Sequence, residues 1–332
     1  MSTLATTHPT LLDLANAMDP NDQIARIAEI LNQKNEILDD MVFIEANGLT
    51  SHRTTARTGI PEPTWRKLYG GVQPTKSTNV QITDSVGMLE AYAEVDKALA
   101  DLNGNTSAFR LSETRPHIEG FNIKVARSLF YENEDTTPEA FTGLAPRFNS
   151  LSASNGRNII SGAGSGSDNT SVWLLVWGPD TIHGIYPKGS KAGLVSEDLG
   201  RVTIENVDGA GGRMEAYRSH FRWDLGLTVR DWRYAVRVAN IDVSDLTKNA
   251  ATGADLIDLM TQALEAVEDL SSGRPAFYCN RTVRSFLRRQ LVNKVAPSTL
   301  TMDMVAGKKV MTFDGVPVRR CDQITSTEAA VA

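Results

Sequence analysis

The sequence predicts an α+β fold, because stripes of apolar residues at helical spacing and apolar strand-like runs are both present and no internal repeat relates them. The helical stripes lie near residues 24–38, 83–102 and 253–270. The strand-like runs are concentrated between residues 172 and 241. A chain of 332 residues can bury a core of this kind without disulfides or structural metals.

The N-terminal part is predicted to be first helical and then extended. Helices are expected over residues 11–18 and 23–39, the second after the start signal Asp19-Pro20-Asn21-Asp22. Residues 47–79 carry no helical stripe and are rich in glycine and proline, and their threonine-rich part, 50–58, is predicted to form an exposed hairpin. Because a structureless stretch of this length is unusual inside a compact domain, we predict an extended functional loop.

The clearest predicted helix covers residues 83–102, where Asp84 marks the start and Asn103-Gly104-Asn105 the end. Its apolar stripe consists of Val86, Leu89, Tyr92, Val95, Leu99 and Leu102. Further along the chain we expect a strand at 121–131, a short helix at 138–148 and a long surface loop at 150–171.

The second half is predicted to contain strands, two helices of opposite charge and a closing hairpin. The expected strands cover residues 172–177, 181–186, 201–206, 214–234 with a continuation to 241, and 276–279. Helix 253–270 carries five acidic residues and no basic one, whereas helix 281–294 carries five basic residues and no acidic one. We therefore expect the two helices to lie near each other or on complementary interfaces. Residues 310–313 and 316–320 are predicted to pair around Asp314-Gly315.

Charge is concentrated at the N-terminal end. Residues 1–45 hold eight acidic and two basic residues, and residues 46–80 hold five basic residues and one acidic residue. In a monomer the two segments could fold on each other, and in an oligomer they could clasp neighbouring subunits. Surface ion pairs contribute little stability each, so we interpret the pattern as a means of fixing register.

Composition excludes several classes of protein. A net charge of −6 argues against a general nucleic-acid coat, although the basic residues Arg281, Arg284, Arg288 and Arg289 keep a nucleic-acid contact open as an alternative. Two cysteines, Cys279 and Cys321, exclude a disulfide-rich scaffold. No apolar run approaches the ~18 residues of a membrane helix and no secretory signal is visible, so we expect a soluble protein made inside the cell.

Catalytic and cofactor motifs are not found. Residues 184–191 resemble a phosphate loop, but Lys and Ser stand in the wrong order and no helix follows. Residues 162–166 lack the third glycine of a dinucleotide fingerprint. There is no Gly-x-Ser-x-Gly elbow, and the five histidines show no metal-ligand spacing. We predict no catalytic residue, cofactor or metal; a soluble enzyme without a recognisable motif is the more distant alternative.

The segment Gly226-Leu-Thr-Val-Arg-Asp-Trp-Arg-Tyr234, running on to Val238-Ala-Asn-Ile-Asp242, resembles the major capsid proteins of short-tailed, podovirus-like bacteriophages. The closing Phe313-Asp-Gly-Val-Pro-Val318 hairpin is similar as well, and the order of elements agrees over nearly the whole chain. The resemblance implies a Hong Kong 97-type capsid fold. It would divide the chain into an N-terminal arm (1–45), an extended loop (46–80), a peripheral domain (81–125, 200–250 and 310–332, with a spine helix at 83–102) and an axial domain (126–199 and 251–309).

The resemblance also implies a function. The chain would be a structural protein that assembles as hexamers and pentamers into an icosahedral shell enclosing double-stranded phage DNA, formed in the host cytoplasm and located in the virion. Expected partners are other copies, scaffold, cement or decoration and portal proteins, and packaged DNA contacted non-specifically, but no membrane. An extended loop that becomes ordered on contact would permit maturation from a precursor shell. The alternative is another virion component, such as a decoration or tail protein.

Charge and resemblance together give the expected intersubunit contacts. In the extended loop these residues are Arg53, Arg57, Trp65, Arg66 and Lys67, with Trp65 as an apolar anchor. In the acidic arm they are Asp39, Asp40 and Glu45.

Overall fold

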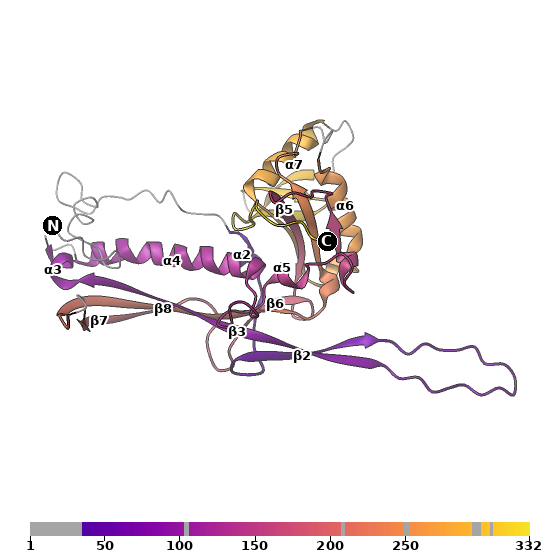
Figure 1. Cartoon of the computed structure of the whole chain (residues 1–332), viewed down its shortest axis with the longest axis horizontal. Coiled ribbons are helices and arrows are strands. Elements are labelled where there is room, and N and C mark those ends of the chain that lie inside the picture. The colour runs from indigo at the N-terminus through magenta and orange to yellow at the C-terminus, as the bar shows by residue number, and fades with distance from the viewer. Residues whose placement is uncertain (1–34, 103–105, 207–209, 249–252, 294–299, 306–307) are drawn as a thin grey trace. The chain divides into compact units, whose positions relative to one another are not determined.

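The computed structural model describes residues 35–102, 106–206, 210–248, 253–293, 300–305 and 308–332. Most of the predicted N-terminal helices therefore lies outside the described residues; the end of the second is the short helix α2 (Ile37–Asp40). The chain divides into two compact units (Figure 1). Among the described residues, unit 1 consists of Met88–Val125 and Gly193–Asp224, and unit 2 comprises the remainder.

Unit 2 is built on a sheet whose central strand, β5 (Asn169–Trp177), is buried along its whole length. β5 pairs antiparallel with β10 (Arg274–Cys279) and with β9 (Ala235–Asp242), and β9 pairs with β4 (Ile159–Ser161). Complete burial is typical of a strand covered on both faces. Because β5 includes residues 172–177, the prediction of a strand there is confirmed. The sheet continues outward on both sides through the strands β13 (Val316–Arg320), β12 (Lys308–Phe313), β11 (Leu300–Val305), β6 (Ile182–Tyr186) and β1 (Phe43–Glu45).

Alternate residues of β5 face two different layers. Val172, Leu174 and Val176 pack in one core with the helices α6 (Leu256–Ala266) and α7 (Arg281–Asn293), which confirms both predicted helices. On the other face, the Trp173 ring contacts the rings of Phe130 and Phe148 with centroids 6.0 and 5.9 Å apart. Phe130 belongs to the long helix α4 (Thr106–Tyr131), and Phe148 follows the short helix α5 (Leu144–Arg147).

Unit 1 contains the antiparallel strands β7 (Val195–Glu205) and β8 (Arg213–Val229), of which β8 extends into unit 2. β8 also neighbours β3 (Thr78–Asp96), which is followed by the short helix α3 (Lys97–Ala100). The core of this unit joins β3, α4 and β8 through Ala93, Phe121 and Phe221.

The prediction of a helix over 83–102 is wrong, since these residues lie mainly in β3, and the long helix is α4. The same segment also carries a period of two, with Leu89, Ala91, Ala93 and Val95 on one side of the strand. β2 and β8 supply hydrogen-bond partners along β3, so pairing overrides the helical stripe. The predicted strand at 121–131 is also wrong, because these residues form the last part of α4. Pro116 and Gly120, inside α4, have low helix propensity and weaken the helical signal of the sequence.

Other boundaries also differ from the prediction. The predicted loop at 150–171 contains the 3₁₀ turn η2 (Gly156–Asn158), β4 and the start of β5, and only Leu144–Arg147 of the predicted helix 138–148 is helical. The expected continuous strand from 214 to 241 is split into β8 and β9 by the 3₁₀ turn η3 (Trp232–Tyr234). The Asp231 side chain caps this turn by accepting a 3.0 Å bond from the Arg233 backbone N–H. A second 3₁₀ turn, η4 (Leu270–Ser272), precedes β10.

A buried ionic cluster ties the C-terminal segment to the sheet of unit 2. Arg237 on β9 donates to Glu328 Oε2 at 2.8 Å and to the Phe148 carbonyl at 2.7 Å, and both charged side chains are 5% exposed. Tyr131 and Ser171 also donate to the Glu328 carboxylate, and burial raises the pKa of Tyr131 so that its hydroxyl stays protonated. Both charges are therefore paired and hydrogen-bonded, as buried charges must be.

We predict that Glu328→Ala lowers the free energy of unfolding by about 3–5 kcal/mol, because it leaves the Arg237 charge buried without its partner. The matched control is Glu205→Ala, which removes a pair with Arg213 whose side chains are both 68% exposed, and should cost less than about 1 kcal/mol. Urea unfolding of the two variants measures the difference. Equal losses would show that the buried cluster contributes no more than a surface pair.

Candidate assembly surface

Residues 51–85 form a long hairpin, and its ladder fixes which side chains share a face. β2 (Ser51–Gly59) pairs antiparallel with the first half of β3, from Ser51 opposite Ser85 to Gly59 opposite Thr78, with an irregularity between Arg57 and Gly59. Figure 1 shows the linking segment, residues 60–77, continuing beyond the ends of the two strands. We call residues 51–85 the hairpin and residues 60–77 its tip.

The two faces of the hairpin differ in chemistry. Arg53, Thr55 and Arg57 alternate along β2 on one face, and all three are exposed. The residues opposite them are the uncharged Thr83, Gln81 and Asn79, so the arginines have no carboxylate partner across the ladder. The other face carries Thr54 and Ala56 opposite Ile82 and Val80. The hairpin therefore has one basic face and one mainly apolar face.

The tip exposes large apolar side chains. Trp65 and Tyr69 are fully exposed at 105% and 102%, and Leu68 and Ile60 are exposed at 89% and 87%. The tip has local order around a turn in which the Gly70 N–H donates to the Lys67 carbonyl at 3.0 Å and Arg66 Nε donates to the Gly70 carbonyl at 2.9 Å. Several large exposed apolar side chains within one short segment are typical of an interaction site.

The base of the hairpin is fastened within unit 2. Asp84, almost fully buried, pairs with Arg147 at 2.8 Å, and Arg147 also donates to the Leu227 carbonyl at 3.2 Å. The Asn47 side chain bonds both backbone groups of Arg53, donating at 2.6 Å and accepting at 2.9 Å. Sequence reasoning missed Asp84 and Arg147, because a charge pair 63 positions apart leaves no local signal.

Two histidines meet beside this base. The rings of His52 on β2 and His183 on β6 are in edge contact with centroids 5.8 Å apart. His183 is buried. Burial lowers the pKa of His183 to about 4, and the proximity of His52 lowers it further. At neutral pH the pair is therefore uncharged.

The acidic candidates lie elsewhere in unit 2 and are partly engaged by their own chain. Asp40 accepts from the Tyr278 hydroxyl at 2.9 Å and from Arg319 at 3.0 Å; burial raises its pKa, and both partners oppose that shift. Glu45 accepts from the Gly189 N–H at 2.8 Å. Asp39 is exposed. The structure thus gathers Arg53, Arg57, Trp65, Arg66 and Lys67 on one hairpin and places the three acids apart from it.

The described residues offer no catalytic arrangement. They contain no group of three or more His, Cys, Asp or Glu side chains able to hold a metal, and none of their helices is long and apolar enough to cross a membrane. Burial raises the pKa of both cysteine thiols to about 12, so neither is a ready nucleophile.

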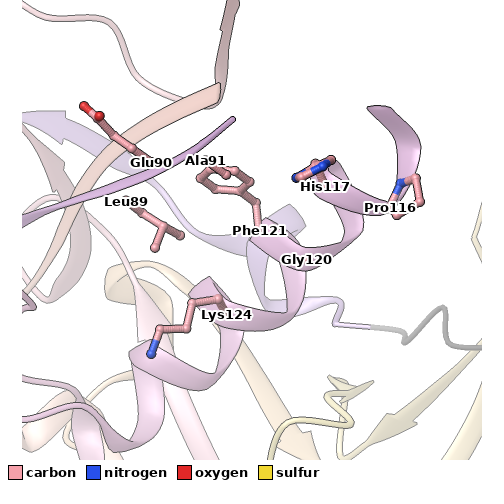
Figure 2. Close-up of a pocket in the computed structure, with 8 residues that line it drawn as sticks. All are labelled: Leu89, Glu90, Ala91, Pro116, His117, Gly120, Phe121 and Lys124. Carbon is pink, nitrogen blue, oxygen red and sulfur yellow. The ribbon is translucent and has the colours of Figure 1, made fainter. Parts of the chain in front are cut away.

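A pocket of about 310 Å³ lies between β3 and α4 in unit 1. Figure 2 shows the side chains of Leu89 and Phe121 between the two elements, with the charged ends of Glu90 and Lys124 directed away. His117 in the same lining stacks on the Phe221 ring, and burial lowers its pKa.

One family model and several solved structures match the chain. The family model described as Major capsid protein GP7 matches residues 19–332. A chain in the solved structure of bacteriophage Epsilon15 is similar, with a TM-score of 0.79 and 44% sequence identity, over 100% of this chain and 99% of that chain. A chain of the bacteriophage JBD30 capsid gives a TM-score of 0.47 at 9% identity, over 89% of this chain and 92% of that one. No curated protein matches the sequence.

Because His183 is buried, we expect the free energy of unfolding to depend on pH. The pKa of about 4 in the folded chain lies below the ~6.5 of an unfolded histidine, so the unfolded state binds more protons between these values. Stability is fully present above pH ~6.5 and falls as the pH drops toward 4, by on the order of 2 kcal/mol.

His183→Phe should flatten this part of the pH dependence, as measured by urea unfolding at several pH values. A slope unchanged by His183→Phe would contradict the assignment.

Proposed function

Because the chain belongs to the major capsid protein GP7 family, we propose that each copy joins the shell by laying its hairpin on a neighbouring copy. Family membership makes the chain a shell-forming structural protein of a phage virion, not an enzyme, and its α+β fold is of the Hong Kong 97 type. Our proposal concerns the surfaces that hold the copies together. The single observation that carries our answer is the exposed apolar tip at the end of a fastened hairpin.

The apolar groups of the tip supply the attraction. Trp65, Leu68 and Tyr69 are in contact with water in the isolated chain, so covering them on another copy is favourable by about 25 cal/mol for each Å² of apolar surface removed. Large aromatic side chains are also the residues that most often dominate binding energy at interfaces.

The basic face of the hairpin supplies register. Arg53 and Arg57 lie four positions apart on the same face of β2, and the residues opposite them in the ladder are uncharged, so both arginines can pair with acidic groups of another copy. The acidic N-terminal arm, in which Asp39 remains exposed, is the proposed complement. Many such contacts act together in a shell, and multivalency makes the assembly stable although each contact is modest.

We also propose the form of the complete shell, which the resemblance to podovirus-like capsid proteins implies. Copies would form rings of six and five that close into an icosahedral shell around double-stranded DNA, assembled in the cytoplasm of the host. Scaffold, cement or decoration and portal proteins would be its partners. A hairpin held at its base and free along its length could change its contacts as a precursor shell matures.

Replacing residues 60–77 by an Asn-Gly turn joining Gly59 to Thr78 should leave a folded subunit that forms no shells, because the apolar contact surface is lost while the ladder and base remain. Electron microscopy with sedimentation measures assembly, and circular dichroism reports folding.

Trp65→Ala with Leu68→Ala tests the same surface more gently. Both side chains are exposed, so the free energy of unfolding should change by less than about 0.5 kcal/mol while shell yield falls. Shells formed in normal yield by the chain lacking its tip would refute this role of the hairpin.

Arg53→Glu with Arg57→Glu should impair assembly, and the defect should be larger at 50 mM than at 500 mM salt, because screening weakens like-charge repulsion. Light scattering follows assembly at each salt concentration. Lys188→Glu with Lys191→Glu, which reverses two exposed charges elsewhere in unit 2, is the control. A defect independent of salt would contradict an electrostatic role for the arginines.

A further inference from the structure

Helix α6 presents an acidic face to solvent. Asp258 and Glu265 are seven residues apart, which places them two turns apart on one side of the helix, and both are exposed. The opposite side, with Met260, Ala263 and Leu264, is buried in the core.

Helix α7 presents a basic face in the same way. Arg281 and Arg288 are also seven residues apart, and Arg289 lies beside the second; all three are exposed. Val283 and Leu287 on the other side are buried in the core that holds α6.

The two charged faces do not neutralise each other within the chain. Among the residues that the structure describes, no ion pair joins α6 to α7. Asp258 accepts only from Gln262 of its own helix, at 2.7 Å, and the cation of Arg289 lies over the Phe286 ring at 4.5 Å. Arg281 reaches Asp322 only at 3.5 Å, with its side chain 71% exposed.

Two of these charges also stand where their own helix disfavours them. Arg281 opens α7, at the positive end of the helix dipole, and Glu265 lies one residue before the end of α6, at the negative end. Neither charge therefore stabilises the helix that carries it.

We propose that the basic face of α7 in one copy packs against the acidic face of α6 in the next copy of the same ring. This inference rests on the proposed function, because it requires copies to meet in rings. Each copy carries both complementary faces on one unit, and Figure 1 shows α6 and α7 along different margins of that unit. A contact between two different surfaces repeats head to tail and closes into a ring when the rotation permits.

Another copy fits these faces better than DNA does. A polyanion would be attracted by Arg288 and Arg289 but repelled by Asp258 and Glu265 on the neighbouring helix of the same core. A second copy satisfies both faces at once.

Two charge-reversed variants test the pairing. Arg288→Glu with Arg289→Glu makes both faces acidic, and Asp258→Lys with Glu265→Lys makes both faces basic. Each variant alone should lose rings and shells, because like charges then meet at every contact. Lys188→Glu with Lys191→Glu, which reverses two exposed charges elsewhere in unit 2, should assemble as the unchanged chain does.

Mixing the two variants in equal amounts gives the decisive result. Acidic and basic copies can then alternate, so rings with an even number of copies should return, while rings of five, which cannot alternate, should stay absent. Native mass spectrometry counts the copies in each ring. Normal assembly of either variant alone, loss of assembly in the lysine control, or no rescue on mixing would overturn the pairing. Normal shells with reduced DNA content in the Arg288→Glu, Arg289→Glu variant would overturn it in favour of nucleic acid. If the unchanged chain forms no shells at all, the proposed function fails instead.

Discussion

The pairing of β2 with the first half of β3 is the interaction on which the candidate assembly surface depends. Nine residues of β2 in extended conformation reach about 30 Å, which carries the tip away from the Asp84–Arg147 pair that fastens the base. The same ladder sets Arg53 and Arg57 on one face and the apolar residues on the other. A two-stranded hairpin is only marginally stable in water, so this segment gains most of its stability when another surface covers it.

Stability and association are thus assigned to different parts of the molecule. The sheet around β5 is covered on both faces, and the Arg237–Glu328 cluster fixes the C-terminal segment on it. The hairpin and the exposed faces of α6 and α7 contribute little to that core, but they carry apolar and charged groups that are exposed in a single copy. A shell subunit needs this division, because it must fold before it meets its neighbours.

The sequence predicted elements best where one pattern was unopposed. β5 is apolar at every position from Val172 to Trp177, and α6 and α7 have clean amphipathic stripes, so all three were found. Residues 83–102 carry both a helical and a strand period, and only the partners β2 and β8, distant in sequence, decide between them. α4 was missed because Pro116 and Gly120 interrupt its pattern, although its packing residues Phe121, Val125 and Leu129 recur at helical spacing.

The candidate surface was predicted only in part, for a similar reason. Charge and turn-forming residues marked 46–80 as extended and basic, which led to Arg53, Arg57 and Trp65. Local patterns could not reveal that Asp40 is held by Tyr278 and Arg319, since those partners lie more than 200 residues away. Nor could they reveal the anchoring of Asp84, which reads as a helix start in the sequence but is a buried ion-pair partner in the fold.

A photo-crosslinking amino acid in place of Trp65 would show whether the tip of the hairpin lies on a neighbouring copy. Shells would be assembled from a mixture of ¹⁵N-labelled and unlabelled copies, irradiated, and digested for mass spectrometry. We expect crosslinked peptides that combine a labelled and an unlabelled copy, with residue 65 joined to one defined surface of the neighbour. Crosslinks confined to single copies, in shells of normal yield, would contradict it.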